Sequence, residues 1–101
     1  MRALWRDLVV AEAPDEELVE VDGAWFFPPH SVNRELLVPS ETGYTCSWRG
    51  DASYFSIEAG GEREPDAAWC YPHMDAEAAA RIGVDAREYV AFSPAVSVIP
   101  S

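Results

Sequence analysis

The chain has 101 residues, which suits one domain over residues 1–101. A chain of this length can bury roughly 65% of its unfolded surface, enough to fold without disulfides or bound metals. Its hydrophobic content of 49% and charged content of 25% are those of an ordinary globular protein. The net charge of −11 makes it an acidic protein that repels phosphate backbones and anionic lipids, so we expect no nucleic-acid partner and no membrane partner.

Three apolar runs fill the first 29 residues and predict three short strands in a meander. They are RDLVVAEA (6–13), ELVEV (17–21) and AWFF (24–27). The dipeptide Asp22-Gly23 separates the second run from the third and is a strong hairpin signal. The next segment, SVNRELL (31–37), predicts a helical turn with Ser31 as its N-cap and Pro39 as its stop.

The rest of the chain predicts further strands and one helix. The strand segments are TGYTCSWRG (42–50), ASYFSIEA (52–59), DAAWCYP (66–72), EYVAF (88–92) and AVSVI (95–99). The alanine-rich segment near 75–82 predicts the helix, with Arg81 in its last turn and Gly83 closing it. Seven or eight short strands with one short helix indicate a compact, mainly β domain.

Aromatic side chains concentrate in the middle of the chain. Because strand side chains alternate between faces, Phe55 and Ile57 are expected to point into the core. Four other aromatics are more than one small core needs, and they would either line a cleft or fill the core: Trp48, Tyr54, Trp69 and Tyr71. Arg49 stands beside Gly50, where it could hold a carboxylate or phosphate; the alternative is a surface salt bridge.

The two cysteines and two histidines leave catalysis and metal binding open at this point. Cys46 could act as a nucleophile if a histidine lay near it, or it could be a small buried hydrophobe. Cys70 and His73 have zinc-ligand spacing, but structural zinc sites usually use two such pairs. We therefore expect no metal and no cofactor. With only two cysteines and no apolar run near the roughly 20 residues of a membrane span, a cytoplasmic location is expected.

Three stretches together carry a specific combination of motifs: WRDLVVAEA, WFFPPHSVNRELLVPSETGYTCSWRGDASYFSI and PDAAWCYPHMDAEAAARIGVDAREYVAF. They resemble a bacterial family, domain of unknown function family 427, sometimes labelled a nucleotidyltransferase domain. Phe27 and Pro28 match its Y/F-F-P element, and Ser40 matches an isolated serine. The central T-x-C-P-W-K-G-x-A-x-Y motif is matched by Thr45, Cys46, Trp48, Gly50, Ala52 and Tyr54. The later D-A-A-W-x-Y-P motif is matched by Asp66, Ala67, Ala68, Trp69, Tyr71 and Pro72.

The chain departs from that pattern at three positions. Ser47 stands where proline is usual, Arg49 where lysine is usual, and Cys70 where an aromatic is usual. Arginine keeps the positive charge but does not favour a lysine nucleophile. The resemblance implies a β-tent or Mss4-like fold of two small sheets, without zinc-binding cysteine pairs, and no proven activity. Nucleotidyl transfer would need Mg²⁺-holding carboxylates and a phosphate loop, and neither is visible in the sequence.

Taken together, these features favour a small-molecule binding module with an aromatic-lined pocket and an arginine at its rim. Its ligand would be anionic or aromatic. The residues expected to bind it are Cys46, Trp48, Arg49, Tyr54, Trp69 and Tyr71. Two alternatives stay open: a structural or protein-interaction domain, which could form a homodimer, and an enzyme that uses Cys46 or a histidine.

Overall fold

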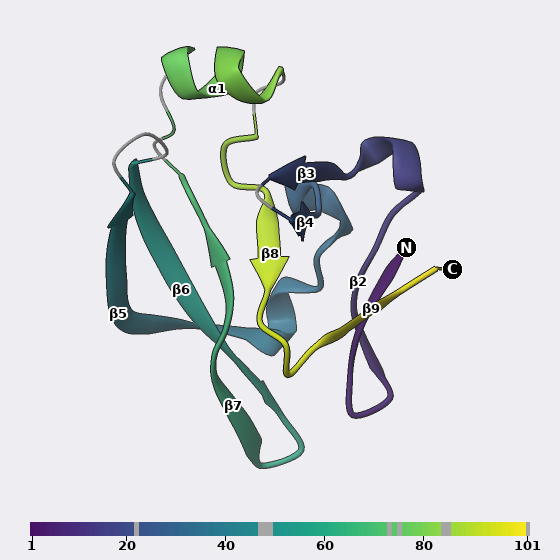
Figure 1. Ribbon diagram of the computed structural model, residues 1–101. Coiled ribbons are helices and arrows are strands. Elements are labelled where there is room, and N and C mark those ends of the chain that lie inside the picture. The colour runs from purple at the N-terminus through teal and green to yellow at the C-terminus, as the bar shows by residue number, and fades with distance from the viewer. Residues whose placement is uncertain (22, 47–49, 73, 75, 84–85, 101) are drawn as a thin grey trace.

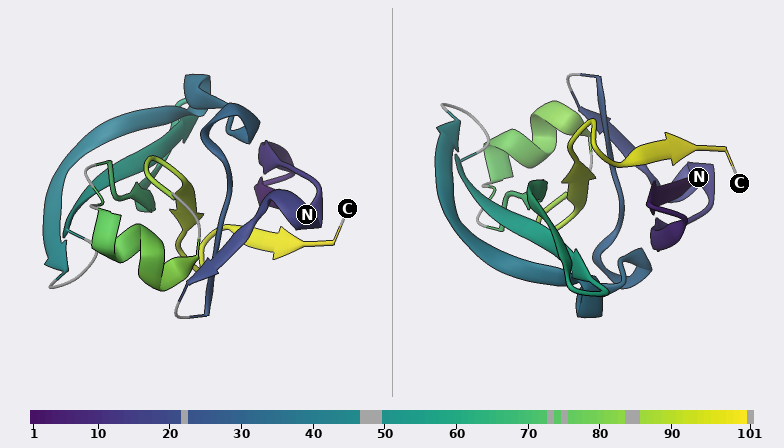
Figure 2. Two further views of the ribbon diagram at one scale, coloured as in Figure 1. Left: turned by 90° about the horizontal axis from the view of Figure 1, so that it is seen from above. Right: turned by 90° about the horizontal axis from the view of Figure 1, so that it is seen from below.

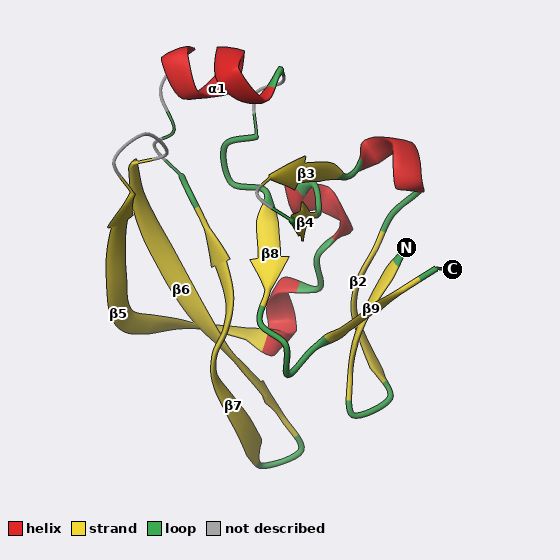
Figure 3. Ribbon diagram, viewed as in Figure 1, coloured by secondary structure: helices red, strands yellow, loops and turns green. Residues whose placement is uncertain are grey.

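Antiparallel strands dominate the fold. The computed structural model describes residues 1–21, 23–46, 50–72, 74, 76–83 and 86–100, and over these residues it has nine strands, one α-helix and three short 3-10 turns (Figure 3). The strands are β1 (Arg2–Trp5), β2 (Leu8–Glu12), β3 (Val19–Val21), β4 (Ala24–Phe26), β5 (Leu37–Cys46), β6 (Gly50–Ala59), β7 (Glu62–Cys70), β8 (Val90–Phe92) and β9 (Ser97–Ile99). The helix is α1 (Ala76–Ile82), and the 3-10 turns are Asp15–Glu17, Pro29–Ser31 and Arg34–Leu36.

The strands form three sheets, with the orders β2-β1-β9, β3-β4 and β5-β6-β7-β8. In Figure 1 the four-stranded sheet stands on one side of the molecule, the three-stranded sheet on the other, and α1 covers one end. Figure 2 shows that β5 and β6 form a strongly curved outer wall and that the two chain termini lie side by side. The expectation of a mainly β fold with a short helix near 75–82 is confirmed.

The four-stranded sheet packs on both of its faces. Tyr54 pairs with Trp69, and their neighbours Phe55 and Ala68 form the next pair, whose side chains therefore lie on the opposite face. The Phe55 face packs against the three-stranded sheet and forms the larger core, which includes Trp5, Val10, Phe27, Ile57 and Val90. The Tyr54 face packs under α1 and beside the β3–β4 hairpin, and this smaller core includes Val21, Phe26, Tyr71, Met74 and Ala78. Both Phe55 and Ile57 point into the larger core as the alternation predicts.

Two adjacent phenylalanines connect these cores. Phe26 belongs to the smaller core and Phe27 to the larger one, and Phe27 is 0% exposed. The backbones of Phe27 and Val90 exchange two hydrogen bonds, with N···O distances of 2.8 and 2.9 Å. This isolated bridge attaches the first 27 residues to β8 and hence to the four-stranded sheet.

The hairpin turns follow the backbone freedom of their residues. Gly60 and Gly61, which join β6 to β7, have φ angles of 59° and 80°, a left-handed pair that favours glycine. Arg6 and Asp7 adopt the same region, with φ angles of 51° and 68°, and join β1 to β2. The Arg6 guanidinium lies 5.1 Å from the centre of the Trp5 ring and pairs with Glu62, so the two turns contact each other.

The three strands predicted for residues 1–29 occur as β2, β3 and β4, but the meander is wrong, because β2 pairs with β1 and not with β3. The sequence reading missed β1, which precedes the first predicted run and is joined to β2 by the two-residue turn at Arg6 and Asp7. The hairpin at residues 22–23 is confirmed, since β3 and β4 pair from Val19–Phe26 to Val21–Ala24. However, that hairpin forms a sheet of its own instead of extending β1 and β2.

The predicted helical turn after residue 31 occurs as two 3-10 turns. Ser31 lies at the end of the first turn, where its hydroxyl donates to the carbonyl of Pro28 at 2.7 Å, so it is not an N-cap. Pro39 does not stop a helix; it lies inside β5, which begins at Leu37. The strand predicted at 42–50 ends at Cys46 in the structure.

Helix α1 closes the open end of the smaller core. Its Ala78 is 2% exposed and packs into that core. Gly83 follows the helix with a φ of 96°, and its N–H donates to the carbonyl of Ala79 at 2.9 Å, as the sequence predicts for a helix end. No helix among the described residues has the length and apolar character needed to cross a membrane.

Replacing Phe27 by alanine should destabilise the protein by about 3–5 kcal/mol, because the ring is fully buried in the larger core. The half-buried Trp69 provides the comparison, and Trp69→Ala should cost less, about 1–3 kcal/mol. Urea unfolding of both variants measures the two free energies. A Trp69→Ala loss equal to or above that of Phe27→Ala would contradict this packing scheme.

Candidate functional site

Two β-bulges flank the central strand β6. In β5, residues 40–42 stand opposite the single residue Tyr54, between the pairs that precede and follow it. In β7, residues 65–67 stand opposite the single residue Ser56. Bulges bend a strand and turn side chains away from the regular alternation. As a result, polar residues from β5 and β7 can meet over β6, although these two strands are not neighbours in the sheet.

Proline and aspartate explain why the bulges form at these points. Proline cannot donate to a strand ladder and is confined to edges and bulges. Pro39 lies on the edge strand β5 directly before one bulge, and Pro65 begins the other. Asp66 follows with a φ of 49°, a left-handed conformation that aspartate tolerates better than most residues.

A hydroxyl–carboxylate cluster joins the bulges. The hydroxyl of Ser40 donates to Oδ1 of Asp66 at 2.5 Å, and the hydroxyl of Thr42 donates to Oδ2 at 2.7 Å. The Thr42 backbone N–H donates to Oγ of Ser40 at 3.2 Å, and the Asp66 N–H donates to Oγ of Ser56 at 3.3 Å. The two hydroxyl donors, Ser40 first and Thr42 second, hold the pKa of Asp66 below its ordinary value, against a smaller opposing effect of desolvation.

A hollow of about 430 Å³ opens beside this cluster. Its lining comes from β5, β6 and β7 and consists of Val38, Pro39, Ser40, Glu41, Thr42, Ser56, Arg63, Pro65 and Asp66. Arg63 is the basic residue in this lining, and its Nε and Nη2 both donate to Glu58, at 2.9 and 2.6 Å. The hollow therefore combines two carboxylates, three hydroxyls and one arginine that is already paired.

Two of the predicted site residues lie on the same sheet face as this hollow. Strand β6 has no bulge of its own, so Tyr54 and Ser56 project from one face, two positions apart. The rings of Tyr54 and Trp69 lie 6.1 Å apart between centroids, tilted by 35°, and both side chains are half-buried. We call these two rings the aromatic pair. Tyr54 lies two positions, about 7 Å, from Ser56 along β6, and both rings of the aromatic pair pack against the smaller core.

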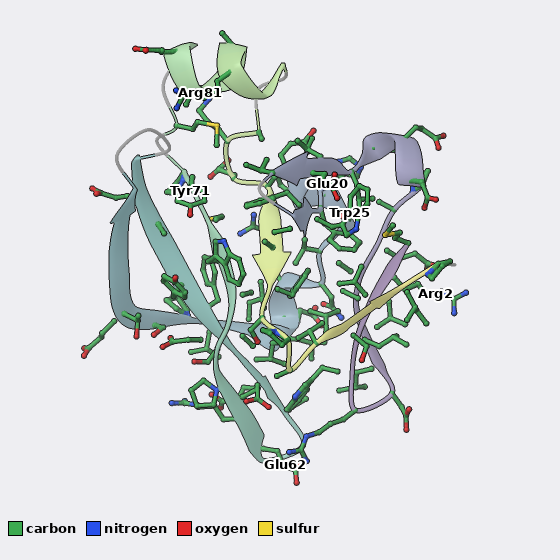
Figure 4. All side chains as sticks on the ribbon, viewed as in Figure 1. Arg2, Glu20, Trp25, Glu62, Tyr71 and Arg81 are labelled. Carbon is green, nitrogen blue, oxygen red and sulfur yellow. The ribbon has the colours of Figure 1, made fainter. Side chains whose placement is uncertain are left out.

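Tyr71 is placed differently. It is 4% exposed and packs against Phe26, with 6.2 Å between the ring centroids. Figure 4 shows Tyr71 beneath α1, at the far end of the sheet from the turn that carries Glu62. The structure thus brings together Tyr54 and Trp69 of the predicted set and puts Tyr71 in the smaller core.

The remaining predicted site residues lie outside the described part of the chain. Trp48 and Arg49 fall between the end of β5 and the start of β6, and the side chain of Cys46 is not described either. Among the described side chains, no three histidine, cysteine or acidic residues lie close enough to hold a metal ion. His30 is exposed and contacts Glu17, with 3.1 Å between Nε2 and Oε1.

Sequence reasoning missed the residues that form the hollow. Ser40 and Asp66 are 26 positions apart, so no local spacing relates them. The signal available was proline within a strand, which marks an edge or a bulge. Pro39 and Pro65 each directly precede one of the two residues.

The Asp66 pKa should rise toward its ordinary value when its donors are removed, with Ser40→Ala having a larger effect than Thr42→Ala. Side-chain carboxyl resonances followed by NMR against pH measure each shift. Because the folded pKa is lowered, the stabilisation by these bonds is present above the unfolded pKa and is lost as pH falls through the folded value. The stability difference between wild type and Ser40→Ala should therefore shrink in acid. A constant difference, or a larger shift with Thr42→Ala, would contradict the assignment.

Cys70 should react slowly with thiol reagents in the native protein. It is 6% exposed, and burial raises its pKa; Arg34 acts in the opposite direction and Glu88 in the same direction. In a Cys46→Ser background, labelling at pH 8 should be at least about tenfold slower in buffer than in urea. Equal rates in both solvents would show that the thiol is accessible.

Comparison with known proteins confirms the family resemblance seen in the sequence. A family described as "Domain of unknown function (DUF427)" matches residues 1–99. No curated protein matches the chain. The match covers all nine strands, both bulges and the aromatic pair. The chain therefore belongs to the DUF427 family.

Proposed function

We propose that this domain binds a small molecule in the hollow between the two bulges, with part of the ligand resting on the aromatic pair. The observation that carries the proposal is the hollow of about 430 Å³, whose polar groups converge from β5, β6 and β7. Ligand sites commonly combine such a volume with a few placed polar groups and an aromatic wall. The half-buried rings of Tyr54 and Trp69 would supply that wall.

The other predicted site residues remain part of this proposal. Cys46 pairs with Gly50 at the end of the β5–β6 hairpin, and Trp48 and Arg49 lie between them in sequence. They would contribute a thiol, a further aromatic ring and a positive charge to the site. We also propose that the protein is bacterial and cytoplasmic, and that its architecture is similar to the β-tent fold. The three-stranded and four-stranded sheets, which pack against each other in the larger core, support that likeness.

One observation favours a second candidate, an interaction domain that forms a homodimer. Three exposed apolar side chains belong to the three-stranded sheet: Leu8, Val9 and Ile99, at 39%, 42% and 38% exposure. They come from β2 and β9, the two edge strands of that sheet. Val9 and Ile99 share one face of this sheet, whereas Leu8, next to Val9 in β2, points to the other face. Exposed apolar residues that share a face are typical of protein contacts.

A thermal-shift screen of a small-molecule library tests the first candidate. A ligand at 100 times its Kd adds about 2.7 kcal/mol, which raises the Tm of a domain of this size by roughly 10–20 °C. Compounds that stabilise the wild type should lose most of this effect with Ser40→Ala and with Trp69→Ala. The matched control is Val9→Ala, an exposed position on the opposite sheet, and it should respond as the wild type does.

Two results would count against small-molecule binding. In one, no compound stabilises the wild type; in the other, the same compounds stabilise Ser40→Ala and Trp69→Ala as strongly as Val9→Ala. Either result, together with concentration-dependent dimerisation in sedimentation that Val9 substitution abolishes, would favour the interaction domain.

A further inference from the structure

The hydroxyl protons of Ser40 and Thr42 are already used within the cluster. A serine or threonine hydroxyl has one proton to donate. The proton of Ser40 goes to Oδ1 of Asp66, and the proton of Thr42 goes to Oδ2. What these three side chains retain for a ligand is the remaining lone pairs on their oxygens. The cluster therefore accepts hydrogen bonds, and a ligand that binds it must donate them.

The charge of the hollow points in the same direction. Asp66 and Glu41 line it with two carboxylates, and Arg63 is held by two bonds to Glu58. The two hydroxyl donors lower the pKa of Asp66, which keeps the carboxylate ionised at neutral pH. The net charge of −11 adds a negative field around the whole molecule. An anion here would meet like charge and acceptors, whereas a cation would meet opposite charge and acceptors.

The aromatic pair is compatible with a cationic ligand as well. The faces of tyrosine and tryptophan rings attract cations, and they also pack against apolar carbon. Tyr54 lies on the same face as Ser56, which lines the hollow and accepts the Asp66 N–H. A molecule with an ammonium group on the cluster could thus lay its carbon skeleton along the rings.

From these three features we propose that the hollow binds a small molecule carrying a primary ammonium group, whose apolar part packs against Tyr54 and Trp69. This inference rests on the proposed function and names the ligand class of the same site. It reverses the charge expected from the sequence, where Arg49 was the reason to expect an anion. Arg49 lies outside the described residues, whereas Asp66 lines the hollow.

The test compares three probes with one ring and one chain length: tyramine, tyrosol and para-hydroxyphenylacetate. They end in an ammonium, a hydroxyl and a carboxylate, respectively. Titrations followed by the amide NMR resonances of the intact protein give both the affinity and the place of binding. Tyramine should shift resonances around residues 40–43 and 66–69, and it should bind at least about tenfold more tightly than para-hydroxyphenylacetate.

Two variants separate the local carboxylate from the overall charge. Asp66→Asn should weaken tyramine binding by about tenfold or more, since a hydrogen bond to a charged group is lost, and should leave tyrosol within about twofold. Glu12→Gln is the matched control, because Glu12 is an exposed carboxylate paired with Arg2 on the opposite sheet. It removes the same charge and should leave tyramine binding unchanged.

The outcomes distinguish this inference from the proposed function. The ammonium assignment is overturned if para-hydroxyphenylacetate binds the hollow as tightly as tyramine, or if Asp66→Asn has no more effect than Glu12→Gln. It is also overturned if none of the three probes shifts these resonances at about 10 mM, a level that would reveal even millimolar affinity. In each case the small-molecule site survives if the library screen finds another ligand that needs Ser40 and Trp69.

Discussion

The reciprocal hydrogen bonds between Phe27 and Val90 are the constraint on which the rest of this structure depends. They fix the chain where it passes between the two larger sheets, so that Phe26 must enter one core and Phe27 the other. A strand alternates its side chains between faces, and consecutive apolar residues can therefore serve two cores only if both faces are covered. That is the situation here: the three-stranded sheet covers one side, and α1 with the β3–β4 hairpin covers the other. The four-stranded sheet is thereby held from both sides.

A sheet held in this way can tolerate irregular strands at its margin. Strand β6 keeps its regular alternation through the centre, while β5 and β7 each carry extra residues beside it. The bulges disrupt ladder pairing, and the cluster of Ser40, Thr42 and Asp66 replaces part of it with side-chain hydrogen bonds. The same bonds that stabilise the irregular region orient its oxygens toward the hollow. The fold of this region and the proposed binding chemistry are thus coupled in one set of contacts, and a change to either hydroxyl should affect both.

Local features of the sequence were sufficient to predict much of the fold. Asp22-Gly23 marked one hairpin, the alanine-rich segment marked α1, and alternation assigned Phe55 and Ile57 to the core. The β1–β2 turn was missed because Arg6 and Asp7 reach left-handed φ values without glycine, stabilised by contacts to Trp5 and Glu62 that are distant in sequence or specific to the fold. The hollow was missed for a related reason. The hollow lies at the register shifts of the β5–β6 and β6–β7 pairings, and no pattern within a single strand encodes how it pairs with its neighbour. Tyr54 and Trp69 entered the predicted set on their residue types alone, because large aromatic rings offer a surface for binding.

The pairing of β1 with β9 has a consequence for how the chain reaches this structure. Arg2 lies opposite Ile99, so the first strand finds one of its partners only near the other end of the sequence. Contacts that span almost the whole chain require closure of a very large loop, which slows folding relative to local pairing. During synthesis from the N-terminus, the β1–β2 hairpin must wait with one edge open until the last strand has left the ribosome.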